Sequence, residues 1–169
     1  MPGSLDEGKD LSLEWIKKVS PKTILDIGVG WGTYARLIKN NGIDVIIDGI
    51  EVWEPYIGIY QLNLWYNRIY NVDARQWDDF EYDLVIMGDV LEHMTKEEAI
   101  AIWDKVSKNS KAAIISIPII HYPQGEYMGN PYEEHVKDDW TTDEVLNTFD
   151  NITEFMEYES VGVFLAEFN

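Results

Sequence analysis

Three glycines at two-residue spacing are the strongest chemical signal in this sequence. Gly28, Gly30 and Gly32 follow the apolar run 23–27 and precede a helical stretch. A turn of this kind lets a ligand approach the backbone closely, because glycine has no side chain. The spacing differs from the G-x-G-x-x-G of nicotinamide dinucleotide sites, since Thr33 occupies the position of the third glycine. The pattern predicts a ligand site of another type, with an ordinary glycine turn as the alternative.

Two acidic positions further along the chain could contact a nucleoside. Glu51 ends an apolar run 19 residues after Gly32, where a carboxylate can accept both hydroxyls of a ribose. Asp73 and Ala74 follow the next apolar run, where a carboxylate could accept the exocyclic amine of adenine and a backbone could meet the ring edge. A solvated strand end for Glu51 and a turn-initiating role for Asp73 are the alternatives.

The elements that must position these residues alternate between strands and helices. The patterning predicts strands at 23–27, 45–51, 68–72, 82–88 and 112–117, and helices at 11–19, 33–40, 56–66, from Thr95 onward, and at 141–149. Two further β-rich runs, 152–158 and 161–168, are close enough to pair as a hairpin. This alternation predicts an α/β fold in which helices cover both faces of a parallel sheet. Ligands of such sheets bind beyond the carboxyl ends of the strands.

Composition excludes several classes of function. The 31 acidic and 13 basic residues give a net charge of −18, which disfavours nucleic acid and anionic membrane surfaces as partners. Without cysteine, a disulfide framework, a thiolate metal site and a cysteine nucleophile are excluded. The length predicts a single domain over 1–169, with a short helix within 1–20. Because segment 1–10 lacks a signal-peptide pattern and no window resembles a membrane span, we expect a cytoplasmic protein.

The order of these motifs resembles the class I S-adenosylmethionine-dependent methyltransferases. The resemblance rests on LDIGVGWG at 25–32, Glu51, the triplet 72–74, and YDLVIMGDVLEHM at 82–94. The last motif is similar to the small-molecule branch of the family, in which xxLEH follows the fourth strand. The resemblance implies a three-layer, doubly wound, Rossmann-like sheet of about seven strands. These strands would be mostly parallel, with an antiparallel strand in the C-terminal hairpin.

The resemblance also implies S-adenosylmethionine as the cofactor and a role for each motif. The glycine loop would hold the methionine part of the cofactor, with Asp26 near its amino group. Glu51 would hold the ribose and Asp73 the adenine. The residues at the end of the fourth strand would lie where cofactor and substrate meet. The complete set of expected cofactor-binding residues is Asp26, Gly28, Gly30, Gly32, Glu51, Asp73, Ala74, Gly88 and Asp89.

Residues 119–140 are the predicted substrate loop. They follow the fifth strand and have little regular patterning, and long irregular segments within a compact domain are usually functional. His135 and His121 lie in this loop and are the candidate general bases, because an imidazole suits proton removal near neutral pH. For His93, packing or helix capping is as good an interpretation as catalysis. We expect no metal, since an activated sulfonium methyl requires mainly positioning.

The sequence therefore predicts direct methyl transfer to an oxygen or nitrogen atom of a small neutral or cationic molecule. Segment 124–169 contains twelve acidic residues and one lysine, which disfavours anionic acceptors near the site. One alternative is a non-catalytic cofactor-binding or regulatory module of the same fold, suggested by the short segment before the first strand. The other is a protein or peptide methyltransferase, because an acidic face would attract basic targets.

Overall fold

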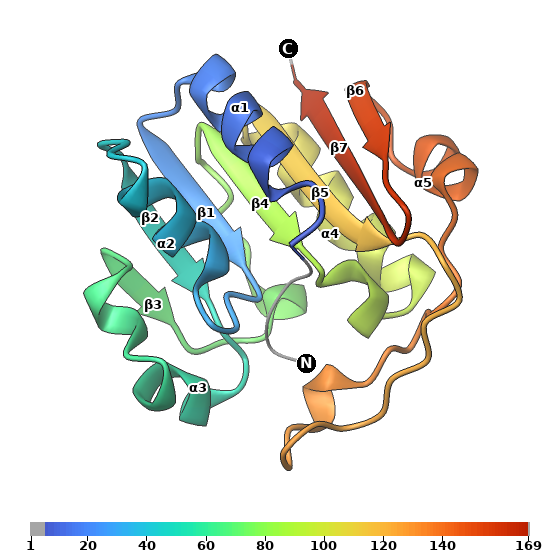
Figure 1. The fold of residues 1–169 in the computed structure, drawn as a ribbon, viewed down its shortest axis with the longest axis horizontal. Coiled ribbons are helices and arrows are strands. Elements are labelled where there is room, and N and C mark those ends of the chain that lie inside the picture. Colours follow the sequence, from blue (N-terminus) through green and yellow to red (C-terminus); the bar gives the residue numbers. More distant parts are fainter. Residues whose placement is uncertain (1–5, 169) are drawn as a thin grey trace.

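The computed structural model describes residues 6–168, which form one mixed sheet with helices on both faces (Figure 1). The strands are β1 (Thr23–Ile27), β2 (Ile46–Ile50), β3 (Arg68–Tyr70), β4 (Leu84–Gly88), β5 (Ala112–Pro118), β6 (Ile152–Glu157) and β7 (Val161–Glu167). Their order across the sheet is β3-β2-β1-β4-β5-β7-β6. The first five strands are parallel, and β7 lies antiparallel between β5 and β6. The predicted seven-stranded sheet with its antiparallel hairpin strand is confirmed.

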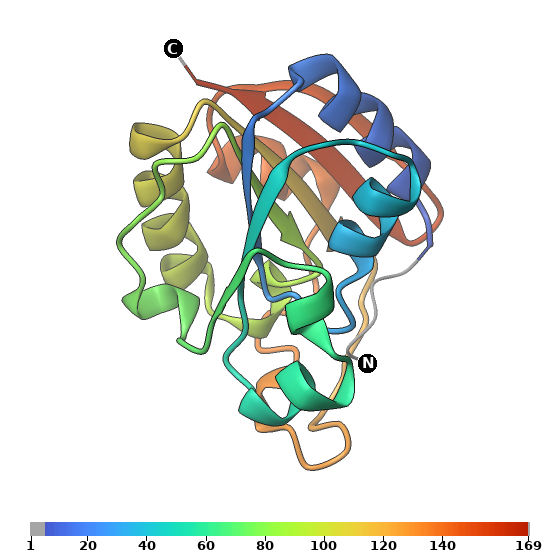
Figure 2. The same ribbon diagram turned by 90° about the vertical axis from the view of Figure 1, so that its left-hand side faces the viewer.

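Helices pack against both faces of this sheet and make three layers (Figure 2). The helices are α1 (Lys9–Val19), α2 (Thr33–Asn40), α3 (Glu54–Ile59), α4 (Lys96–Asn109) and α5 (Thr142–Thr148). Side chains of α1 and α2 share one buried apolar cluster with the sheet, and those of α4 and α5 share the cluster on the opposite face. Almost every residue of the central strands β1, β4 and β5 is buried, as parallel strands covered on both faces require. The edge strands β3 and β6 are largely exposed or half-buried. The first five residues of the expected N-terminal segment 1–20 lie outside the described residues.

Local sequence explains where α4 begins. The Thr95 hydroxyl accepts a hydrogen bond from the Glu98 backbone N–H at 3.2 Å, and the Glu98 carboxylate accepts one from the Thr95 N–H at 2.9 Å. This reciprocal capping box satisfies backbone donors that the first turn of a helix leaves without partners.

The predicted helix over 56–66 was wrong in its extent. The helix in this region, α3, begins at Glu54 and ends at Ile59, and a short 3-10 helix follows at Leu62–Leu64. Gln61 lies between them with a φ of 52°, a left-handed conformation that an α-helix cannot contain. Two short elements therefore replace the single helix that the aromatic pattern predicts.

The predicted substrate loop, 119–140, crosses the carboxyl-end side of the sheet between β5 and α5 (Figure 1). It contains a short 3-10 helix at Pro131–Glu133 and little other regular structure. None of the helices within residues 6–168 combines the length and apolar character needed to cross a membrane. The fold thus places the loop beside the strand ends, where sheets of this class bind ligands.

Candidate active site

A pocket lies at the carboxyl ends of β1, β2 and β4. Its walls are the turns that follow these strands, the segment 73–75, and residues of the loop 119–140. Seven of the nine residues predicted to bind a cofactor line it: Gly28, Gly30, Glu51, Asp73, Ala74, Gly88 and Asp89. The other two, Asp26 and Gly32, are not among the lining residues. The fold therefore gathers most of the predicted set into one cavity.

The glycine turn after β1 requires glycine on conformational grounds. Gly28, Gly30 and Gly32 have φ values of 67°, 48° and 75°, and such left-handed conformations favour residues without a Cβ. A Cβ at Gly28 would lie 2.7 Å from a methyl carbon of Val90. The turn after β1 therefore packs directly on the turn after β4. Gly32 instead faces Leu62, which a Cβ would approach to 3.2 Å.

Glu51 connects the glycine turn to the end of β2. Its side chain is buried, and its two carboxylate oxygens accept hydrogen bonds from the backbone N–H groups of Gly30 at 3.0 Å and Trp53 at 2.8 Å. An ionised carboxylate has about four acceptor positions, so two remain after these bonds form. Burial raises the pKa of Glu51 to about 7. The carboxylate is thus fixed in the pocket wall with unused capacity to accept hydroxyl groups.

Asp26 lies within β1 behind this wall. It is 2% exposed and accepts a hydrogen bond from the Tyr66 hydroxyl at 2.5 Å. Burial raises the pKa of Asp26 to about 7, and the Tyr66 hydrogen bond partly opposes that rise. In the described structure this carboxyl holds the segment before β3 against the sheet. Its expected place near the cofactor's amino group stays a prediction.

Asp73 is already engaged by a basic neighbour. Its carboxylate pairs with the Arg75 guanidinium at 2.5 Å and also accepts the Arg75 backbone N–H at 2.9 Å. These contacts lower the pKa of Asp73. Arg75 contacts Glu98 as well, at 2.9 Å. Sequence reasoning did not anticipate Arg75, which occupies acceptor positions of Asp73 that the predicted adenine contact would need.

Gly88 ends β4 and Asp89 follows it, in a tightly packed region. A Cβ at Gly88 would lie 2.1 Å from a ring carbon of Tyr34, so a side chain there has no room. Asp89 has a φ of 54°, and its backbone N–H donates to the Ser116 carbonyl at 2.7 Å. A non-glycine residue in this conformation is uncommon and often belongs to a functional site.

Lys9, from the start of α1, reaches this same region. It is 7% exposed, and its Nζ lies 3.4 Å from Asp89 Oδ2 and 3.3 Å from Ser116 Oγ. The ammonium also lies 5.0 Å from the centre of the Tyr34 ring. Sequence reasoning missed Lys9, because a lysine at a helix start shows no pattern that would indicate burial. It supplies a positive charge behind Asp89.

The three histidines differ in where they lie relative to the pocket, and the general-base roles of His135 and His121 stay predictions. His121 is exposed over 71% of its side chain and lies 3.6 Å from Asp138, outside the pocket lining. The His135 ring packs 4.9 Å from the ring of His93. His93 lines the pocket, whereas His135 does not. Burial lowers the pKa of both His93 and His135. The xxLEH motif, which follows β4 directly, was the signal that could have placed His93 at the site.

The loop 119–140 supplies one wall of the pocket through Asn130, Tyr132 and Glu133. Glu133 is buried and accepts a hydrogen bond from the Tyr56 hydroxyl at 3.0 Å. The Tyr132 ring lies 6.3 Å from that of Trp53, which follows Glu51 closely in the chain. These contacts join the loop to the β2 side of the pocket. They could not be read from the sequence, since the partners are far apart along the chain.

Comparison with known proteins identifies the fold. No family model and no curated relative matches the sequence. Among solved structures, the chain is similar to an S-adenosylmethionine-dependent methyltransferase from Clostridium acetobutylicum ATCC 824, with a TM-score of 0.74 and 13% identity over 98% of this chain and 93% of that one. It is also similar to magnesium protoporphyrin IX methyltransferase from Synechocystis PCC 6803 with bound SAH, with a TM-score of 0.69 and 16% identity over 96% and 83% of the two chains.

A third similar structure is a candidate O-methyltransferase from Nostoc punctiforme PCC 73102, with a TM-score of 0.71 and 15% identity over 94% of this chain. This chain spans 55% of the length of that protein. The sequence resemblance stated above is thus confirmed at the level of architecture. The chain has the fold of the class I S-adenosylmethionine-dependent methyltransferases.

Proposed function

We propose that the pocket binds S-adenosylmethionine and that the protein transfers its methyl group to an oxygen or nitrogen atom of a small neutral or cationic molecule. The observation that carries this proposal is the Glu51 carboxylate, which two backbone N–H groups fix in the pocket wall beside Gly28 and Gly30. A carboxylate with two unused acceptor positions suits the paired hydroxyls of a ribose.

The remaining lining residues fit the other parts of such a cofactor. The glycine turn leaves the backbone open to close approach, and Asp73 with Ala74 lines the side of the pocket toward β3. Gly88 and Asp89 line the end of the pocket at β4. When bound, S-adenosylmethionine supplies a methyl group on a sulfonium, already activated for direct displacement. The protein's contribution is to hold an acceptor atom in line with that methyl group.

Charge in the pocket supports a neutral or cationic acceptor. Its lining includes four acidic residues, Glu51, Asp73, Asp89 and Glu133, and Arg75 as the basic residue. Arg75 is already paired with Asp73 and Glu98. Acidic side chains therefore outnumber basic ones in the lining, which disfavours an anionic acceptor. We propose that the pocket promotes methyl transfer by positioning the acceptor atom, and not through proton removal by His135 or His121.

Isothermal titration with S-adenosylmethionine and with its demethylated product, SAH, tests cofactor binding. We expect one site per chain, and no binding at millimolar ligand would refute the proposal. Release of SAH over a panel of neutral alcohols and amines then tests transfer. Binding without turnover on the whole panel would contradict the enzymatic part and favour a non-catalytic cofactor-binding module.

A further inference from the structure

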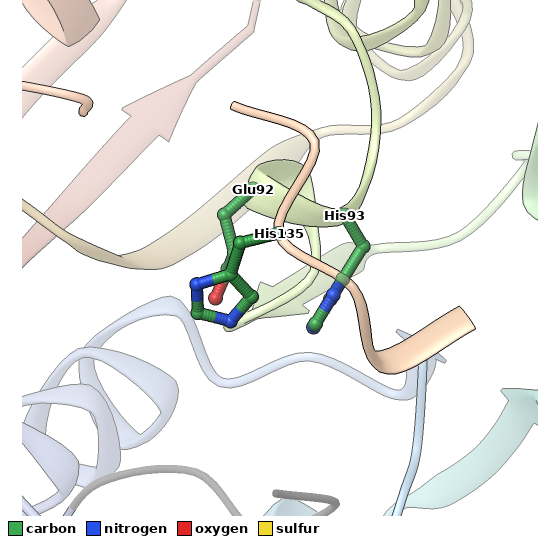
Figure 3. Close-up of side chains that lie close together, drawn as sticks. All are labelled: Glu92, His93 and His135. Carbon is green, nitrogen blue, oxygen red and sulfur yellow. The ribbon is translucent and has the colours of Figure 1, made fainter. Parts of the chain in front are cut away.

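The side chains of Glu92, His93 and His135 lie close together (Figure 3), and His93 lines the pocket. Each residue offers a ligand atom, and these atoms all lie within 4.8 Å of one another. Glu92 and His93 belong to the short 3-10 helix at Leu91–His93 after β4, whereas His135 comes from the loop 119–140. The fold thus gathers one carboxylate and two imidazoles, a ligand set common to zinc and other first-row transition metals.

Both imidazoles are oriented by backbone carbonyls. His93 Nδ1 lies 3.0 Å from the Glu134 carbonyl oxygen, and His135 Nδ1 lies 2.6 Å from the Tyr122 carbonyl oxygen. A carbonyl accepts hydrogen bonds and cannot donate them, so a neutral ring in either position carries its proton on Nδ1. The lone pair is then on Nε2. Histidines that bind metals are held in this way, by a hydrogen bond from the other ring nitrogen.

Glu92 supplies an independent indication of a missing partner. Its side chain is 2% exposed, and its Oε2 atom has no hydrogen-bond partner among the described residues. A buried carboxylate oxygen without a partner is costly, and a cation removes that cost. The buried ammonium of Lys9 is engaged elsewhere, with Asp89 at 3.4 Å and with Ser116 at 3.3 Å.

We propose that Glu92, His93 and His135 form a binding site for one divalent transition-metal ion, with zinc preferred over magnesium. Two imidazole ligands favour zinc, cobalt or nickel, whereas magnesium prefers oxygen ligands. Bond lengths of about 2.0–2.2 Å would draw the three ligand atoms closer together than they lie in the described structure. Three protein ligands leave a fourth position open, as in catalytic zinc sites. One of the three ligands, His93, also lines the pocket.

This site revises the expectation that the protein holds no metal. That expectation followed from the chemistry of a sulfonium methyl group and did not consider which histidines the fold brings together. The proposed metal site does not depend on the proposed methyltransferase function, because its evidence is the geometry of the three side chains alone.

Zinc titration of metal-stripped protein without a polyhistidine tag tests the site. We expect one zinc ion per chain by isothermal titration, with magnesium binding at least tenfold more weakly. His93→Ala, His135→Ala and Glu92→Gln should each weaken zinc binding by at least tenfold. His121→Ala is the matched control, since it removes the remaining histidine, which is 71% exposed and paired with Asp138 outside the cluster. Its zinc affinity should equal that of the unmodified protein.

Circular dichroism of each variant without metal shows whether it folds. If the buried Glu92→Gln variant does not fold, the two histidine variants carry the test. Zinc binding unchanged in His93→Ala and His135→Ala, or lost equally in His121→Ala, would overturn the site. The absence of zinc binding to the unmodified protein would also overturn it. A parallel SAH titration separates the two proposals, since failure to bind SAH with zinc binding intact refutes only the proposed function.

Discussion

Replacing Glu51 gives the sharpest test of the cofactor pocket. In the folded protein this carboxylate accepts the N–H groups of Gly30 and Trp53 at 3.0 and 2.8 Å. A hydrogen bond to a charged group contributes about 1.5–3 kcal/mol. Glu51→Ala removes the two backbone bonds together with the proposed bonds to the ribose hydroxyls. The loss of one ribose bond is enough to lower SAH affinity at least tenfold, because a factor of ten corresponds to about 1.4 kcal/mol.

The pH dependence of SAH binding gives a second expected change in affinity. Burial raises the pKa of Glu51 to about 7. The ionised form, which has the unused acceptor positions, is populated above that pH and is lost as the pH falls through it. At one unit below the pKa only about one-tenth of the carboxyl groups are ionised. If the ionised form binds, SAH affinity should fall roughly tenfold between pH 8 and pH 6.

Isothermal titration of SAH at pH 6, 7 and 8 measures both effects. Glu51→Gln keeps the size of the side chain but cannot ionise, so its weaker binding should show no such change with pH. Glu54→Gln is the control, because Glu54 is exposed at the start of α3 and does not line the pocket. Unchanged SAH affinity in Glu51→Ala, with an intact fold by circular dichroism, would refute the assignment of Glu51 to the ribose.

Three further predictions concern buried groups around the site. Burial raises the pKa of Asp26 from 3.8 to about 7, so the folded state holds its proton more tightly than the unfolded state. Between those values the protein should lose stability relative to Asp26→Asn as pH rises, by up to about 1.4 kcal/mol per pH unit. Urea unfolding at several pH values measures this difference, and a pH-independent difference would contradict the raised pKa. Lys9→Ala removes the ion-pair partner of the half-buried Asp89 carboxylate and should lower the free energy of unfolding by about 3 kcal/mol. The exposed control Lys17→Ala should change it by less than about 0.5 kcal/mol, and equal effects would argue against a buried ion pair. Gly88→Ala places a methyl group 2.1 Å from a Tyr34 ring carbon and should cost about 1–3 kcal/mol, measured by thermal unfolding. A fully stable variant would show that the ring can move aside.

The α/β architecture could be predicted because its signals are local. Apolar runs of strand length, the glycines at 28, 30 and 32, and the caps at Thr95 and Thr141 each depend on neighbouring residues. The resemblance to class I methyltransferases also placed Glu51 and Asp89 at one cofactor site, and both residues line the pocket. The prediction of one helix over 56–66 was wrong because the left-handed turn at Gln61 has no strong local signal in the sequence.

The sequence by itself determined the fold class, the glycine turn and the position of Glu51, because steric and hydrophobic periodicity act between residues close in the chain. Only the tertiary structure decided which side chains meet across long separations. His93 and His135 come together because the loop 119–140 folds back over the end of β4. Lys9 reaches Asp89 because α1 packs on the sheet beside β4 and β7. Such contacts depend on the path of a loop and the packing of a helix, which no local pattern specifies.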